Sequence, residues 1–297
     1  MNAASTWRLE FARNAANAFV TNDKVDAVIV GGSTARGHAD RWSDIELGVF
    51  WSEPPTDADR ESAAERVDGD LFRHYPFDAT EQVWCDDFYL GHDADGGPNT
   101  GVLLEVVHMT VEAMDEALDT VLNSFDPDPS KQNVLSAIKD GVPLHGSTSM
   151  DEWKERVGTY PDGLAEAVVR ANAQIDHFWR SEMWIDRGDN AMMLHDSFIV
   201  AERRMLHTLL GLNRQYFFGF KWLDVVDQRL EAKPPGLIER IRESHAVGGR
   251  EGALIVSGLV EETYDLLDRS DIDIDVERLR SIFRYRRSTW GTTPPDP

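Results

Sequence analysis

The chain has 297 residues, 41% of them hydrophobic and 28% charged, which fits one large or two ordinary globular domains with a sizeable core. Its net charge of −23 argues against indiscriminate binding to nucleic acids, because a negative surface repels polyanions at long range. The same charge would attract a cationic substrate, although adaptation to salt or a need for solubility would explain it equally well.

The sequence gives no sign of a membrane or secreted protein. No run of about 18 apolar residues occurs, so we expect no membrane-spanning helix. Residues 1–19 lack a basic start followed by an apolar core, so we expect no secretion signal. Cys85 is the only cysteine, which rules out a disulfide within the chain. We therefore expect a cytoplasmic protein.

Helix and strand patterns alternate in the first half of the chain, and helix patterns alone fill the second. The predicted elements of the first half are a helix over 1–22, strands over 25–30 and 44–51, a helix over 60–67, strands over 80–90 and 102–110, and helices over 111–124 and 132–140. Long helix-period stretches follow over 162–186, 189–212, 221–231, 235–245 and 250–268. The composition thus predicts an α/β region up to residue 149 and a helical region over 150–297.

Two carboxylates stand out on the strand over 44–51. Asp44 and Glu46 are two residues apart, so they project from the same face of a strand. An uncompensated pair of this kind is costly through desolvation and mutual repulsion. A divalent cation removes that cost, and magnesium prefers carboxylate oxygens completed by phosphate and water. The pair therefore predicts a magnesium site.

A glycine-serine turn lies directly upstream of this pair. Gly31 and Gly32 let the backbone approach a phosphate closely, and Ser33 offers a hydroxyl beside the backbone amides. Arg36 could add a charge-assisted contact to the same phosphate. The alternative is an ordinary turn before a solvated edge strand, which would explain the acids but not the combined spacing.

The stretch GSTARGHADRWSDIEL resembles the DNA polymerase β-like nucleotidyltransferase superfamily, and most closely the antibiotic nucleotidyltransferases that act on kanamycin and lincosamides. The resemblance implies that Gly32 and Ser33 hold a nucleoside triphosphate and that Asp44 and Glu46 bind magnesium. It also implies an α+β fold, in which a nucleotidyltransferase-type mixed sheet with flanking helices over 1–149 precedes an all-α helical bundle over 150–297. The second domain would close over the substrate and nucleotide.

That family usually carries a third carboxylate on a later strand. Glu105 is the best candidate, because a lone acid within so apolar a strand, VLLEVVHMT, is costly unless it is used. Its role would be metal ligand, general base or both. Asp86 and Asp87 are rivals, and since neighbours on a strand point to opposite faces only one of them could join the site. Glu105 could alternatively face solvent.

In the second half, LGLNRQYFFGFKWLD resembles a Leu-Asn-Arg-x-Tyr…Lys-Trp element in the helical domain of uncharacterised nucleotidyltransferase-like proteins. The resemblance implies that Asn213, Arg214, Tyr216 and Lys221 line the nucleotide cleft. Tyr216 could instead belong to the core, and Lys221 could extend to solvent along Trp222. The acidic run over 271–275, DIDID, lacks a glycine-serine turn, and we interpret it as a helix-capping, solvated segment.

The implied reaction moves a nucleoside monophosphate from a nucleoside triphosphate, ATP by default, to a hydroxyl of a small molecule with release of pyrophosphate. Two magnesium ions would serve as cofactors. The resemblance names aminoglycoside- or lincosamide-like antibiotics as acceptors, and some relatives build a shared site across a homodimer. Two alternatives stay open: a toxin-like enzyme acting on tRNA or protein, and a nucleotide-binding, antitoxin-like regulator without turnover.

Overall fold

The structure is a computed structural model, and it describes residues 1–67, 69–91, 101–146, 148–188, 190–289 and 291. The chain divides into two compact units. The first unit comprises Met1–Ser124 and Ser130–Thr159, and the second comprises Phe125–Pro129 and Tyr160–Pro297.

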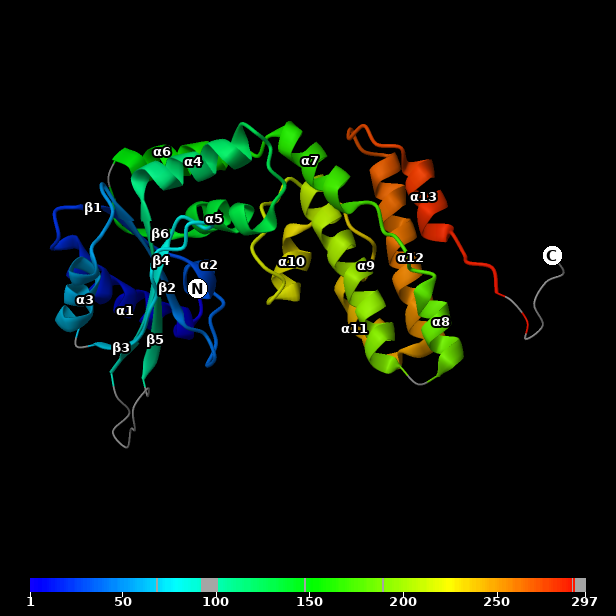
Figure 1. The fold of residues 1–297 in the computed structure, drawn as a ribbon, viewed down its shortest axis with the longest axis horizontal. Coiled ribbons are helices and arrows are strands. Elements are labelled where there is room, and N and C mark those ends of the chain that lie inside the picture. The colour runs from blue at the N-terminus through cyan, green and yellow to red at the C-terminus, as the bar shows by residue number, and fades with distance from the viewer. Residues whose placement is uncertain (68, 92–100, 147, 189, 290, 292–297) are drawn as a thin grey trace. The chain divides into compact units, whose positions relative to one another are not determined.

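The first unit is built on a six-stranded mixed sheet, formed within the described residues in the order β3-β4-β5-β2-β1-β6 (Figure 1). The strands are β1 (Val25–Val30), β2 (Ile45–Trp51), β3 (Gly69–His74), β4 (Trp84–Leu90), β5 (Val102–Thr110) and β6 (Val142–His145). Central strands β2 and β5 run parallel, while each of the other neighbouring pairs is antiparallel. A mixed sheet of this kind needs covering on both faces.

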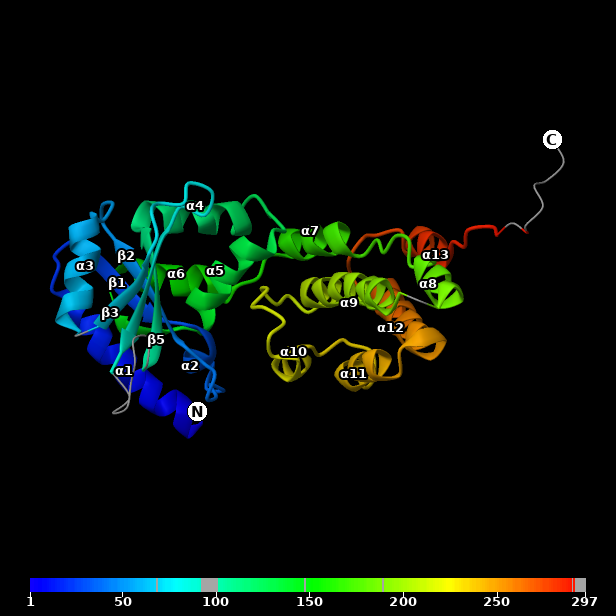
Figure 2. The ribbon, with the colours of Figure 1, turned by 60° about the horizontal axis from the view of Figure 1, so that its bottom comes forward.

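Helices cover both faces of the sheet, as the turned view in Figure 2 shows. They are α1 (Ala3–Val20), α2 (Gly32–Arg36), α3 (Asp57–Arg66), α4 (Val111–Leu122), α5 (Pro129–Asp140) and α6 (Thr148–Gly158). Local signals fix several of their starts: Asn2 caps α1, Thr56 and Asp59 form a capping box on α3, and Thr110 caps α4. Helix α6, which contains residue 150, lies within the first unit.

The main core of the first unit lies on the sheet face under α1 and α3. Alternate residues of the strands point there, among them Leu47 and Val49 of β2 and Leu104 and Val106 of β5, and pack against Phe19 of α1. The opposite face of the same strands carries Glu46 and Glu105, so the core side of β2 and β5 is mainly apolar and the other side holds these acids.

The second unit is helical. Its helices are α7 (Asp162–Asn172), α8 (Arg180–Arg187), α9 (Ala191–Leu212), α10 (Leu223–Arg229), α11 (Leu237–Val247), α12 (Gly249–Asp268) and α13 (Val276–Arg284). The long helix α9 packs against α7, α8 and α12, and buries Phe198, Met205 and Leu209. No helix among the described residues is long and apolar enough to cross a membrane.

The predicted fold class, a mixed sheet with flanking helices followed by a helical region, is confirmed. Strands β3 and β6 were not predicted, because β3 is an exposed edge strand without apolar alternation and β6 is only four residues long and contains Pro143. The stretch over 162–186 forms two helices rather than one, with His177 in the left-handed region at φ 60° between them. Residue 189, the predicted start of the next helix, lies outside the described residues.

Candidate active site

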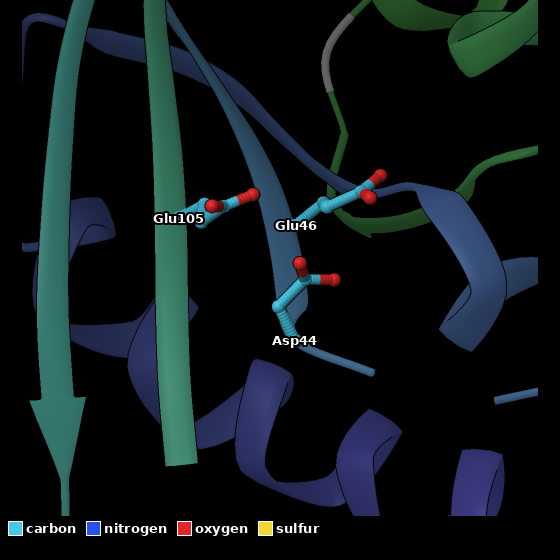
Figure 3. Close-up of side chains that lie close together, drawn as sticks. All are labelled: Asp44, Glu46 and Glu105. Atoms are coloured by element: carbon cyan, nitrogen blue, oxygen red, sulfur yellow. The ribbon is translucent and has the colours of Figure 1, made fainter. Parts of the chain in front are cut away.

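Three carboxylates meet on one face of the mixed sheet, at its central strands β2 and β5. Asp44, Glu46 and Glu105 each offer an oxygen, and these oxygens all lie within 4.8 Å of one another. Figure 3 shows Glu105 projecting from β5 toward β2, where Glu46 and Asp44 extend from the start of the strand. The cluster joins the two acids that were predicted from one short motif with the third that was predicted on a distant strand.

The strand register explains the meeting. In the parallel pair β2–β5, Glu46 lies directly opposite Glu105, so both side chains leave the same face of the sheet. Asp44 directly precedes β2, and its side chain shares that face because it lies two residues before Glu46. The backbone thus fixes the three acids side by side before any ligand binds.

The loop before Asp44 is held by the side chains of Arg8 and Asp40, which were not predicted to contribute to the site. Arg8 of α1 is buried, and its Nε donates to the carbonyl oxygen of Ser43 at 3.0 Å. Burial lowers the pKa of Arg8, while the charges of Asp40 and Asp44 act in the opposite direction. Asp40 in turn accepts from the backbone N–H of Trp42 at 2.8 Å. No local pattern marks Arg8, because its partner is 35 residues away in the sequence.

The predicted glycine-serine turn lies against the acids. Gly31 N–H donates to the carbonyl oxygen of Glu46 at 2.9 Å, which ties the turn to β2. Gly32 has a positive φ of 56°, and a Cβ there would lie 2.1 Å from Glu46 Oε2. Ser33 is buried, and its carbonyl oxygen accepts from Ser5 Oγ at 3.4 Å. The left-handed backbone at Gly32 therefore favours glycine, and a side chain there would displace the Glu46 carboxylate.

Asp86 and Asp87 lie on opposite faces of β4, as adjacent strand residues must. Asp87 pairs with Glu105 in the antiparallel register and so lies on the face of the carboxylate cluster. Its carboxylate contacts Arg73 at 3.2 Å. Burial raises the pKa of Asp87. The charge of Arg73 lowers that pKa, and the charges of Asp86 and Asp44 raise it further. Asp87 is therefore a neighbour of the three acids.

Asp86 points into the other face and belongs to a buried polar network. It contacts Arg60 Nη1 at 2.8 Å, His74 Nδ1 at 2.8 Å and His108 Nε2 at 2.9 Å. Trp51 Nε1–H lies 3.2 Å from His108 Nδ1, and because indole only donates, His108 must carry its proton on Nε2 and donate it to Asp86. Burial lowers the pKa of His108. The network is a structural one, away from the cluster face.

Arg36, predicted to contact phosphate, lies at the end of α2 and holds that helix to α5. Its Nε donates to Asp140 at 2.8 Å and its Nη2 donates to Ser136 Oγ at 3.1 Å. The phosphate contact stays a prediction, whereas the link from the glycine-serine helix to α5 is a feature of the structure.

The four residues predicted from the Leu-Asn-Arg-x-Tyr…Lys-Trp element all lie in the second unit. Asn213 accepts from the N–H groups of Glu231 and Ala232, and it also donates to two carbonyl oxygens. Arg214, at φ 52°, pairs with Asp162 and Asp271, and these two carboxylates raise its pKa.

Tyr216 is buried with its ring 4.8 Å from that of Tyr160, and Lys221 is exposed. Their roles as nucleotide ligands, like those of Asn213 and Arg214, stay predictions. In the acidic run over 271–275, Asp275 caps α13 by accepting from the N–H of Arg278, which agrees with the predicted capping role.

The donor set of the cluster fits a hard divalent cation. It consists of three carboxylates, and magnesium takes oxygen ligands of this kind. Among the residues that the structure describes, this is the one group of three or more acids, histidines or cysteines whose ligand atoms come so close together. Such a concentration of negative charge is costly without a cation, so Asp44, Glu46 and Glu105 are the residues that would hold it.

Comparison with known proteins agrees with the site. Residues 12–89 match the family described as "Nucleotidyltransferase domain", a span that contains the glycine-serine turn, Asp44 and Glu46. The match supports a transferase. Among the curated proteins, no sequence matches this chain.

Solved structures also match, among them a nucleotidyltransferase-like protein from Exiguobacterium sibiricum 255-15. That structure is 12% identical in sequence, with coverage of 88% of this chain and 74% of the other and a TM-score of 0.35. A similarity at this level does not establish a shared activity.

Proposed function

We propose that the chain is a magnesium-dependent nucleotidyltransferase that moves a nucleoside monophosphate from a nucleoside triphosphate to the hydroxyl of a small molecule. The observation that carries the proposal is the meeting of Asp44, Glu46 and Glu105 beside a turn that favours glycine at Gly32. The nucleotidyltransferase match over residues 12–89 supports the same reaction class.

Each part of the site has a role in this reaction. The backbone at Gly31 and Gly32 is close to the acids and would let the triphosphate lie beside them. Asp44 and Glu46 would hold magnesium, together with Glu105. When bound, the metal would neutralise charge on the phosphates and on the departing pyrophosphate. Glu105 projects from β5 toward Glu46, and its carboxylate can accept the proton of the attacking hydroxyl.

In the proposed step, the acceptor oxygen bonds to the α-phosphorus and the bond from that phosphorus to the bridging oxygen breaks. Pyrophosphate leaves with the bonding electron pair, and the hydroxyl proton goes to the Glu105 carboxylate. The atoms and charges balance without a further reactant. ATP is the first donor to test, and kanamycin and lincomycin represent the acceptors that the sequence resemblance proposes.

The test measures pyrophosphate release from ATP and magnesium in the presence of an acceptor panel, with magnesium-dependent ATP binding recorded in parallel. Asp44→Ala should abolish release. Glu105→Gln should lower it by about 10²–10⁴-fold, the usual contribution of a general base, while ATP still binds. Glu10→Gln, at an exposed site on α1 of the same unit, is the matched control. Binding of ATP without any release would point to a nucleotide-binding regulator instead.

A further inference from the structure

The face of the sheet that carries the acids changes character within one step along the strands. Glu46 and Asp87 flank Glu105 in one row across β2, β5 and β4. The next row on the same face, two residues further along β2 and β5, is Gly48, Val107 and Cys85. Rows two residues apart are separated by about 7 Å. The second row, Gly48, Val107 and Cys85, therefore forms a surface of small, mainly apolar groups about 7 Å from the carboxylates, and this surface is called the floor below.

Val107 shows that this floor is open. It lies in the middle of a central strand, yet 42% of it is exposed, whereas Val106 beside it is 1% exposed. Gly48 also lines the cavity and brings no side chain to its place in the row, where Ile29 and Phe50 pack closely. A central strand of a two-faced sheet is normally covered on both sides, so the exposure marks a cavity.

The cavity has a volume of about 450 Å³ and is lined entirely by residues of the first unit. Its floor continues from Val107 to Met109 and Phe50, and its roof is the face of α5 that carries Asn133, Val134 and Ala137. Glu46 and Glu105 form one end. This is the size of a small-molecule site, in which an apolar lining surrounds a few polar groups.

The charges at the cavity are all of one sign. The carboxylic acids among its described lining residues are Glu46, Glu81 and Glu105, and no lysine or arginine is among those lining residues. A ligand with an anionic group would find no lysine or arginine partner among these lining residues. The lining thus suits an apolar body that is uncharged or positively charged.

We propose that this cavity holds the acceptor, and that the acceptor is an alcohol with an apolar body and no anionic group. The inference rests on the proposed nucleotidyl transfer, because it assigns the acceptor side of that site. An alcohol whose body lies over Val107 can place its hydroxyl beside Glu105, which would take the proton as the oxygen bonds to the α-phosphorus and pyrophosphate leaves. A polycationic, polyhydroxylated aminoglycoside would place hydroxyl and ammonium groups against the apolar lining, where they would lose hydrogen bonds to water.

Cys85 provides a native reporter of this cavity. It is the only cysteine, it lines the cavity, and it pairs with Val107 in the register of β4 and β5. Burial raises the pKa of its thiol, and the charge of Asp87 adds to the rise. Alkylation by iodoacetamide at about pH 9 would therefore be slow but specific to one site, and its rate can be followed by mass spectrometry.

The first experiment measures how 1-propanol, 1-butanol, 1-pentanol and 1-hexanol protect Cys85 from alkylation, with kanamycin and ATP as comparison probes. The half-protecting concentration should fall by about fourfold for each added CH₂, the factor expected when a methylene leaves water for an apolar site. A flat series would overturn the proposal. So would protection by kanamycin at lower concentration than 1-hexanol, or protection by ATP alone, which would make the cavity the nucleobase site.

Two variants test the location. Val107→Asn replaces the floor side chain and should raise the half-protecting concentration of 1-hexanol about tenfold, because the contact surface becomes polar. Ala137→Leu narrows the cavity from the side of α5 and should also weaken protection by 1-hexanol. It replaces Val107→Asn in the test if that variant does not fold. Val200→Asn is the matched control, on an exposed site of α9 in the second unit. Unchanged protection in both floor and roof variants would overturn the proposal.

Pyrophosphate release with the same alcohols separates the two hypotheses. Release that rises along the series together with protection would support both. Release without protection of Cys85 would overturn the cavity assignment alone. Protection without release from any acceptor would refute nucleotidyl transfer and with it the role of the cavity as an acceptor site.

Discussion

Glu46 on β2 lies directly opposite Glu105 on β5 in the parallel register, and both side chains leave the same face of the sheet. With Asp44 they bring three carboxylates within 4.8 Å of one another. In the metal-free protein these carboxylates repel one another, whereas a bound cation would attract all three.

The first prediction concerns this repulsion. Glu105→Gln should raise the melting temperature of the metal-free protein, because like charges at this distance repel by about 1–3 kcal/mol at an effective dielectric between water and a protein surface. The same change should abolish most of the stabilisation that magnesium gives the wild-type protein. Differential scanning calorimetry with and without magnesium measures both effects. Glu10→Gln should alter neither, and an unstabilised metal-free Glu105→Gln variant would contradict the prediction.

The second prediction concerns the glycine turn. Gly32→Ala should destabilise the protein by about 1–3 kcal/mol, because a residue with a side chain is strained at positive φ. It should also displace Glu46, whose carboxylate occupies the place of the new Cβ. Gly31→Ala is the matched control, since Gly31 has an extended backbone and a Cβ there would meet Glu46 Oε2 at an ordinary 3.8 Å. Equal stabilities of the two variants in urea unfolding would refute the argument.

The third prediction separates the two neighbouring acids of β4. Asp86→Ala should cost about 3–5 kcal/mol of unfolding free energy, because it removes the buried carboxylate partner of the buried Arg60 guanidinium and leaves it only the exposed Asp57. Asp87→Ala should cost much less, since its partner Arg73 is half exposed and can turn to water. Chemical denaturation of both variants measures the difference. A larger loss for Asp87→Ala would reverse the structural assignment.

The fourth prediction is a pH dependence in the second unit. His207 packs against Phe217 and Phe220, and burial lowers its pKa to about 4, with Arg203 acting in the same direction. The folded state thus favours neutral His207. The stability that depends on neutral His207 is fully present above the pKa of the unfolded chain, and it is lost as the pH falls from about 6.5 toward 4. The loss could reach about 3 kcal/mol before solvent screening reduces it.

His207→Asn should remove this part of the pH dependence, because asparagine does not titrate. Urea unfolding followed by circular dichroism at pH values from about 7 to 4 measures it. The control is His177→Asn, at an exposed histidine of the same unit whose left-handed backbone asparagine tolerates. A slope that persists unchanged in His207→Asn would assign it to other groups.

Features that depend on short spacings could be predicted from the amino-acid sequence alone. The period of a strand places Asp44 and Glu46 on one face, and the glycines before them mark a tight turn, whatever the rest of the chain does. Glu105 was also predictable, because a lone acid in an apolar strand is costly unless it is used. The helical second half followed from its periodicity, although the exposed edge strand β3 and the short strand β6 carried too weak a pattern.

Contacts between residues far apart in the sequence could not be predicted in this way, because they depend on how the strands and helices pair and pack. The pairing of β2 with β5 sets Glu46 opposite Glu105, and the pleat of β4 turns Asp87 toward the cluster and Asp86 into a buried network. Arg8 reaches Ser43 across 35 residues, and α5 roofs the cavity over Val107. Contacts of this kind depend on register and packing between separate elements, and one face of a strand cannot be told from the other until its neighbours are in place.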